Sequence, residues 1–111
     1  MPARIPRNTV ATFIFEQTQE FTRWLVRLKA PQGKTRVLAR IRAAQLGRFG
    51  DCEPVGEGVH EMRIHRGPGY RVYFTRRAQT IYLLLIGGDK ATQSRDIQRA
   101  RQLAHDLKSE G

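Results

Sequence analysis

Charged and aromatic side chains alternate with apolar ones along two short segments in the middle of the chain. Glu61, Arg63 and His65 occupy every second position of the first segment, and Arg71 and Tyr73 do so in the second. Successive side chains of a β-strand point to opposite faces, so each set shares one face if the segments are strands. Two guanidinium groups, a histidine, a tyrosine and a carboxylate would then gather on one surface.

These groups suit RNA cleavage by attack of a ribose 2′-OH on the adjacent phosphodiester. Arg63 and Arg71 can stabilise the additional negative charge on phosphorus. His65 can accept the proton of the 2′-OH or donate one to the leaving 5′-oxygen. Tyr73 could stack on a base or donate a proton, and Glu61 could act as a base or hold an arginine. The chemistry needs no metal ion and no cofactor. Taken alone, however, the alternation favours a solvated sheet face.

A β-hairpin would position these groups. Residues 59–66 and 70–76 flank Gly67-Pro68-Gly69, whose glycines can supply the positive φ of a tight turn. Cross-strand neighbours in such a hairpin lie ~5 Å apart. The apolar sides are expected to lie against helices and to leave the charged sides on an open face. The apolar residues are Met62, Ile64, Val72 and Phe74.

The segments before the hairpin predict one strand and two helices. Residues 10–16 are rich in β-branched and aromatic residues, which is typical of a strand. A helix with Thr18 as its N-cap follows, and Pro31-Gln-Gly33 is expected to break it. A second helix is predicted over residues 34–46, closed by Gly47. The expected inward stripes are Phe21, Trp24, Leu25 and Leu28 in the first helix, and Val37, Leu38, Ile41 and Ala44 in the second.

The remaining segments complete an α+β domain. Residues 49–58 contain several glycines and a proline and are expected to form an irregular connection. Residues 80–86 are apolar on both faces, which predicts an interior strand, and Gly87-Gly88 is expected to end it. A last helix is predicted over residues 93–108. The predicted order is β-α-α-β-β-β-α in a single domain of residues 1–111, with residues 1–8 flexible.

The composition indicates a polyanionic partner. The chain carries 20 Lys and Arg against 10 Asp and Glu, a formal net charge of +10, which attracts nucleic acid or an acidic protein. Five basic residues outside the central set are expected to bind RNA, although a solvated helix face is the simpler interpretation of the first three. They are Lys34, Arg36 and Arg40 of the second helix, and Arg66 and Arg76.

Other features favour a cytoplasmic protein without a metal. No apolar run approaches the ~18 residues of a membrane span, and no signal-peptide hydrophobic region follows the basic N-terminus. The single cysteine, Cys52, cannot form an internal disulfide. One cysteine and three scattered histidines lack the paired spacing of a zinc site.

Two motifs resemble a known family. Glu61-Met-Arg63-Ile-His65-Arg-Gly-Pro-Gly69-Tyr-Arg71-Val-Tyr73-Phe resembles the central hairpin of RelE/ParE-superfamily toxins. Leu83-Leu-Leu-Ile-Gly87-Gly-Asp-Lys90-Ala-Thr-Gln93-Ser-Arg-Asp96-Ile resembles the following strand and turn of the HigB-like "addiction module killer" branch. The similarity extends over most of the chain, from Thr12 to about Leu107.

The resemblance implies a RelE-like fold, with a small, mainly antiparallel sheet, two helices on one face and a C-terminal helix. It implies a toxin that cleaves mRNA, commonly on the ribosome, and that a small helix-turn-helix DNA-binding antitoxin neutralises. Arg71 matches the family's phosphate-binding arginine, Arg63 matches a basic position before the turn, and Lys90 matches a basic residue after the last strand. Asp89 and Gln93 are weaker candidates.

The resemblance leaves two questions open. The chain has no tyrosine after Tyr82, so the C-terminal catalytic tyrosine of some relatives is absent, and His65 and Glu61 are the candidates for the general base. The alternatives to an endoribonuclease are a ParE-like inhibitor of DNA gyrase, which shares the fold, and an RNA-binding module without catalysis. The cluster of Arg63, His65, Arg71 and Tyr73 favours cleavage.

Overall fold

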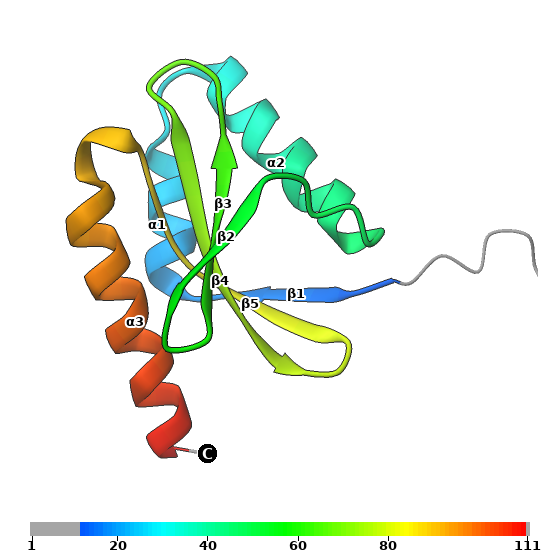
Figure 1. Ribbon diagram of the computed structural model, residues 1–111. Coiled ribbons are helices and arrows are strands. Elements are labelled where there is room, and N and C mark those ends of the chain that lie inside the picture. The colour runs from blue at the N-terminus through cyan, green and yellow to red at the C-terminus, as the bar shows by residue number, and fades with distance from the viewer. Residues whose placement is uncertain (1–11, 111) are drawn as a thin grey trace, which may run out of the picture.

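A five-stranded mixed sheet forms the centre of the molecule in this computed structural model, which describes residues 12–110 (Figure 1). The strand order is β1-β5-β4-β3-β2; β1 runs parallel to β5, and the other neighbours are antiparallel. The predicted α+β class is confirmed. The elements are β1 (Ile14–Gln17), α1 (Gln19–Arg27), α2 (Pro31–Gln45), β2 (Cys52–Gly56), β3 (Val59–Ile64), β4 (Tyr70–Ala78), β5 (Ile81–Gly88), the short 3₁₀ helix η1 (Lys90–Thr92) and α3 (Gln93–Glu110).

The sheet carries a hydrophobic core on each face. Helices α1 and α2 pack on one face and α3 packs on the other (Figure 1). The first core contains Phe21, Val37, Ile41, Ala44, Met62, Ile64, Tyr70, Val72, Phe74 and Leu84. The second contains Val59, Tyr73, Leu83, Leu85, Ile86, Ala100 and Ala104. The predicted alternation of β3 and β4 is confirmed, because Met62, Ile64, Val72 and Phe74 all lie in the first core.

The expectation of an open, charged face is wrong. Helix α3 covers much of the second face, and Glu61 and Tyr73 are completely buried beneath it. Arg71 is also buried, with 7% of its surface exposed. The sequence pattern identified the face correctly, but it does not reveal which helix returns to cover it.

Helix α1 begins as predicted. The Thr18 hydroxyl accepts a hydrogen bond from the Phe21 amide at 3.0 Å and donates one to the Leu85 carbonyl at 2.6 Å. This N-cap therefore fixes the helix end to β5 as well as satisfying a free amide. Phe21 is fully buried, and Trp24 packs against the same core. The start of the predicted first strand, Val10 and Ala11, lies outside the described residues, as do residues 1–8.

Two predictions for α2 are wrong. The segment Pro31-Gln-Gly33, expected to break the first helix, instead forms the first turn of α2, since proline lacks only an amide that is unbonded there anyway. Gly33 is buried because the Tyr70 ring lies against it: a Cβ at this position would be 2.2 Å from the Tyr70 hydroxyl oxygen. Leu38, expected inside, is 47% exposed, because the buried stripe runs one position earlier, through Val37 and Ile41.

The predicted irregular connection contains a strand. β2 pairs with β3 in antiparallel register, with Cys52 opposite Met62, and Pro54 is tolerated because β2 lies at the sheet edge. Gly56 and Gly58 have positive φ and form the turn into β3 rather than interrupting a strand.

Gly87 and Gly88 continue β5 instead of ending it, pairing with Val72 and Arg71. A Cβ at Gly87 would lie 2.1 Å from a ring carbon of Trp24, and one at Gly88 would lie 1.9 Å from Asp96 Oδ2. The two glycines therefore let α1 and the start of α3 approach opposite faces of the same strand closely.

We predict that Gly87→Ala lowers the free energy of unfolding by about 1–3 kcal/mol, the usual cost of overpacking. Urea denaturation followed by circular dichroism measures the loss. A Trp24→Leu background removes the ring that the new methyl group meets, so the same substitution is expected to cost less there. An equal cost in both backgrounds would assign the effect to the backbone instead.

Candidate functional site

A basic pocket of about 340 Å³ opens at the turn between β3 and β4. Gly67 and Gly69 have φ of 53° and 76°, and the Gly69 amide donates to the Arg66 carbonyl at 2.9 Å, which closes the turn. The Lys90 amide donates to the Pro68 carbonyl at 3.3 Å and so attaches η1 to the same turn. The side chains that line the pocket include His65, Arg66, Arg71 and Lys90.

Arg71 and Lys90 reach this pocket in different ways. The Arg71 side chain is largely buried. Its Nη1 donates to the Gly69 carbonyl at 3.3 Å, and its buried Nε has no hydrogen-bond partner among the described residues. Lys90 is exposed, and no carboxylate of residues 12–109 lies within ion-pair distance of its ammonium group. The structure therefore brings Arg71 and Lys90, two candidate site residues, to one pocket.

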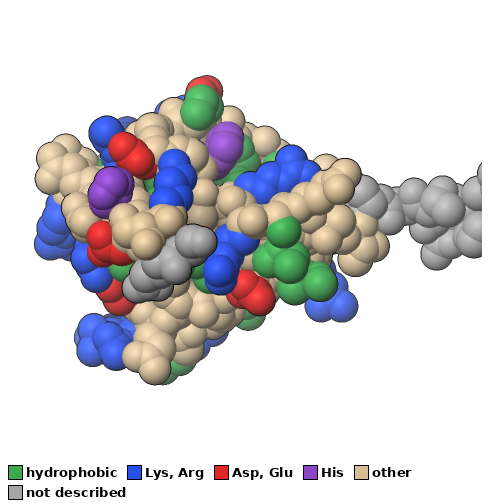
Figure 2. All heavy atoms as spheres, turned by 90° about the horizontal axis from the view of Figure 1, so that it is seen from below, with side chains coloured by type: hydrophobic (Ala, Val, Ile, Leu, Met, Phe, Trp, Pro, Cys, Tyr) green, Lys and Arg blue, Asp and Glu red, His purple; other side chains and the backbone are tan. Residues whose placement is uncertain are grey.

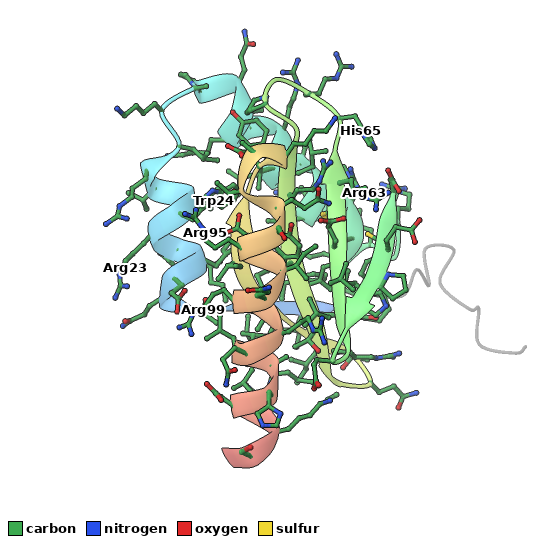
Figure 3. The ribbon with its side chains drawn as sticks, turned by 60° about the vertical axis from the view of Figure 1, so that its left-hand side comes forward. Arg23, Trp24, Arg63, His65, Arg95 and Arg99 are labelled. Atoms are coloured by element: carbon green, nitrogen blue, oxygen red, sulfur yellow. The ribbon has the colours of Figure 1, made fainter. Side chains whose placement is uncertain are left out.

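His65 is paired with an acidic residue that the sequence did not single out. Its Nε2 lies 2.5 Å from Asp51 Oδ2, and the Asp51 carbonyl accepts from the Arg63 amide at 2.9 Å. The hydrogen bond to His65 lowers the pKa of Asp51, so the carboxylate stays ionised. Figure 3 shows His65 just past the end of β3, with Arg63 before it on the strand. Asp51 was missed because it lies in the stretch expected to be irregular.

Glu61 is the centre of a buried network between the sheet and α3. Its carboxylate accepts hydrogen bonds from Arg63 Nε at 2.9 Å, from the Tyr73 hydroxyl at 2.8 Å and from Gln93 Nε2 at 2.8 Å. Arg71 Nε lies 3.8 Å from the same carboxylate. Burial alone would raise the pKa of Glu61, but the hydrogen bonds from Gln93, Arg63 and Tyr73 hold it below its ordinary value.

The same network determines the state of its partners. Burial, followed by the hydrogen bond to Glu61, raises the pKa of Tyr73 far above its ordinary value, so its hydroxyl remains a donor. The hydrogen bond to Glu61 likewise raises the pKa of Arg63. Glu61 and Tyr73 do not line the basic pocket; they are buried behind Arg71 and hold β3, β4 and α3 together.

The other predicted RNA-binding residues are distributed over three places. Arg36 and Arg40 line a second hollow that borders the first, together with His65 and Arg66. Lys34 lies in the first turn of α2 and lines neither hollow. Arg76 lies towards the far end of β4, where it bonds the carbonyls of Ala78 and Gln79 and covers the Tyr82 ring at 5.6 Å. Arg76 is therefore not brought to the pocket.

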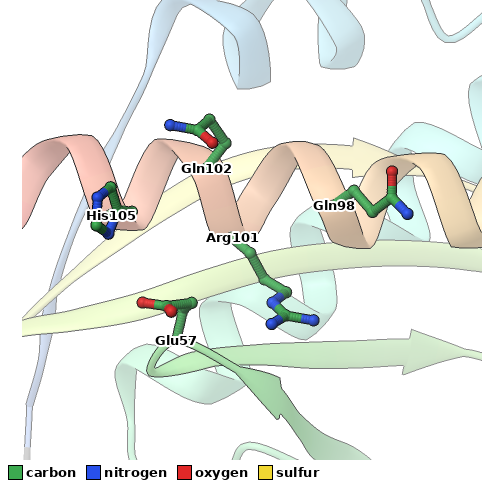
Figure 4. A pocket seen from close by; sticks show the side chains of 5 residues that line it. All are labelled: Glu57, Gln98, Arg101, Gln102 and His105. Atoms are coloured by element: carbon green, nitrogen blue, oxygen red, sulfur yellow. The ribbon is translucent and has the colours of Figure 1, made fainter.

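The opposite end of the molecule has a different character. A hollow of about 450 Å³ between α3 and the β2–β3 turn is lined by Glu57, Gln98, Arg101, Gln102 and His105 (Figure 4). It combines one carboxylate with one guanidinium and amides. The view from below shows acidic, basic and apolar side chains intermixed at this end (Figure 2). The cations converge at the β3–β4 turn and not here.

Within residues 12–110, no group of three or more His, Cys, Asp and Glu side chains is arranged to hold a metal ion. No helix of that part of the chain is long and apolar enough to cross a membrane.

The fold and pocket define an α+β protein with a cationic site at the turn of its central hairpin. The chain is 43% identical over 96 residues to a Haemophilus influenzae protein described as uncharacterized, an alignment that covers 86% of this chain and 97% of that protein. The two proteins belong to one family. No family model matches the chain.

We predict that Glu61→Gln lowers the free energy of unfolding at pH 7 by about 3–5 kcal/mol, because Arg63 and Arg71 lose their buried counter-charge. The folded-state pKa of Glu61 lies below its unfolded value of about 4.3. The stability that ionised Glu61 contributes is therefore fully present above its unfolded-state pKa and is lost as the pH falls through its folded-state pKa.

Urea unfolding at pH 7 and at pH 3 tests this prediction. The difference between wild type and variant is expected to shrink at pH 3. Glu16→Gln serves as the control, since Glu16 is half exposed and its ion pair with Arg77 spans 3.5 Å. That exposed pair is expected to contribute at most about 1 kcal/mol. A Glu61→Gln variant as stable as wild type at pH 7 would contradict the proposed role of the network.

Proposed function

We propose that the chain is a cytoplasmic endoribonuclease toxin of the HigB-like branch of the RelE/ParE superfamily, with a RelE-like fold. The observation that carries the proposal is the basic pocket, in which His65, Arg66, Arg71 and Lys90 line one hollow without a carboxylate. The resemblance of the hairpin and of the strand after it supports the same assignment. The two N-terminal helices on one face of the sheet are consistent with it.

The residues of the pocket have complementary roles in this proposal. Arg71 and Lys90 bind the non-bridging oxygens of one phosphodiester and stabilise the negative charge that develops on phosphorus. The buried network around Glu61 orients Arg71 and Arg63 but does not contact the RNA. Glu61 is thereby assigned a positioning role, and His65 is favoured as the general base because it lies at the pocket.

The reaction is a transesterification. His65 accepts the proton of the 2′-OH as that oxygen attacks phosphorus, and the bond from phosphorus to the 5′-oxygen breaks. The leaving 5′-oxygen takes a proton from a water molecule, and the products are a 2′,3′-cyclic phosphate and a 5′-hydroxyl end. The Asp51 carboxylate holds the imidazole in position through Nε2. The step needs no metal ion, so it is expected to persist in EDTA.

The proposed partners follow from the class of protein. The substrate is mRNA, cut on the ribosome, and a small helix-turn-helix DNA-binding antitoxin neutralises the toxin. The net charge of +10 would favour both the polyanionic substrate and an acidic segment of the antitoxin. An inhibitor of DNA gyrase would not require a convergent phosphate site, so we favour cleavage.

We predict that Arg71→Ala and Lys90→Ala each reduce RNA cleavage by about 100-fold or more, as expected for loss of a transition-state donor. Growth arrest on induction is expected to be abolished with Arg71→Ala. Mapping of mRNA 5′ ends after induction in cells measures the cleavage. Lys90→Ala is the cleaner variant because its side chain is exposed.

Arg77→Ala and Lys108→Ala are matched controls, since both residues are exposed and neither lines the pocket. Both are expected to cleave as wild type does. Circular dichroism and antitoxin binding verify that the Arg71 variant is folded. Intact transcripts accompanied by DNA damage on wild-type induction would refute the ribonuclease proposal in favour of gyrase.

We predict that His65→Ala lowers the cleavage rate by about 10²–10⁴, the usual contribution of a general base. Free imidazole is expected to restore part of this rate, because it can accept the 2′-OH proton in place of the missing ring. The same addition to Lys90→Ala is expected to have no effect. If imidazole rescues neither variant and His65→Ala cleaves as wild type, His65 is not the base.

A further inference from the structure

The second hollow borders the basic pocket. It has a volume of about 350 Å³ and lies between α2 and the end of β3, lined by Arg36, Ala39, Arg40, Ile64, His65 and Arg66. His65 and Arg66 also line the basic pocket, so these two residues form a shared wall. A group bound in the second hollow therefore lies beside whatever occupies the first.

The lining combines an apolar surface with hydrogen-bond donors. Ala39 and the edge of Ile64, which is only 3% exposed, form the apolar part of the lining. Arg36 and Arg66 supply guanidinium donors, and no carboxylate lines the hollow. Such a volume, within the ~300–1,000 Å³ of ligand pockets, suits a planar heterocycle better than a second bare phosphate.

Arg40 and Arg36 differ in whether their guanidinium groups already form hydrogen bonds within the protein. Arg40 Nη1 donates to the Arg63 carbonyl at 2.5 Å and its Nη2 donates to the Phe49 carbonyl at 2.9 Å, so its guanidinium is a fixed part of the wall. Arg36 forms no hydrogen bond or ion pair with any of the residues that the structure describes. Arg36 is therefore the free donor that lines this hollow alone, since Arg66 is shared with the basic pocket, and Arg40 shapes the hollow.

We infer that the second hollow is a nucleobase subsite that selects guanine next to the phosphate held by the basic pocket. The inference rests on the proposed function and names part of its substrate. An arginine offers only donors, and guanine presents two adjacent acceptors, O6 and N7, that match its fork. Adenine presents an amino donor beside N7 and leaves one arginine donor unpaired.

Binding of uncleavable 2′-deoxy dinucleotides to the full chain tests the inference independently of catalysis. Each dinucleotide has one thymine and one purine joined by a single phosphate. The purine is guanine or adenine and stands on the 5′ or the 3′ side, and NMR titration measures the affinity of each ligand. Guanine is expected to bind about tenfold more tightly than adenine on one side of the phosphate. The amide signals of Ala39 and Ile64 are expected to shift on binding.

Two arginines of the same helix provide a matched pair. Arg36→Ala is expected to reduce the guanine preference to less than twofold, whereas Arg42→Ala, an exposed residue outside the hollow, is expected to retain it. Lys90→Ala is expected to weaken both ligands equally and to leave their ratio unchanged. Absence of a guanine preference in wild type, or its persistence in Arg36→Ala, overturns the subsite.

The test separates this inference from the proposed function. If the dinucleotides discriminate as described but RNA is not cleaved, the subsite stands and the endoribonuclease proposal fails. If RNA is cleaved in an Arg71-dependent manner and guanine is not preferred, the endoribonuclease proposal stands and the subsite is wrong.

Discussion

The buried carboxylate of Glu61 is the interaction on which the rest of the site depends. Glu61 lies on β3, two residues before Arg63, and Arg63 is paired with Arg71 on the neighbouring strand β4. Two guanidinium groups that close would repel each other without a counter-charge, and burial would magnify the cost. Glu61 supplies that charge from within β3 and also accepts from Gln93, so the same group fixes the position of α3.

This arrangement divides the hairpin into a supporting part and an accessible part. In the supporting part, beneath α3, both carboxylate oxygens of Glu61 accept hydrogen bonds from side chains of the protein. Towards the turn, Lys90 remains unpaired within the described residues and Arg71 lines the hollow. Rigid support behind exposed cations preorganises the site, so a bound anion would not have to reorganise these side chains. The fold therefore concentrates its charge at the end of the sheet where the short turn and η1 meet.

The sequence predicted the helices and strands better than it predicted which helix covers which face of the sheet. Periodicity identified α1, α3 and the β3–β4 hairpin, and alternation assigned the faces of Met62 and Tyr73 correctly, because these signals are local. It could not show that α3 covers the second face, that Gly33 accommodates Tyr70, or that Gly87 accommodates Trp24, since those reasons lie in partners distant along the chain. Of the candidate site, Arg71, His65 and Lys90 meet at one pocket, Glu61 and Tyr73 lie behind it, and Asp51 carried no signal.

The parallel pairing of β1 with β5 has a consequence for synthesis of the chain. The Thr18 hydroxyl donates a hydrogen bond to the carbonyl of Leu85, 67 positions later, and among the described strands β1 pairs with β5 alone. Closing so long a loop is entropically costly and comes late. On the ribosome, the N-terminal strand and helix must wait until β5 has emerged, and Lys90 follows directly after it. The pocket is thus assembled only after β5 and Lys90 have been translated, which limits any function of shorter nascent fragments.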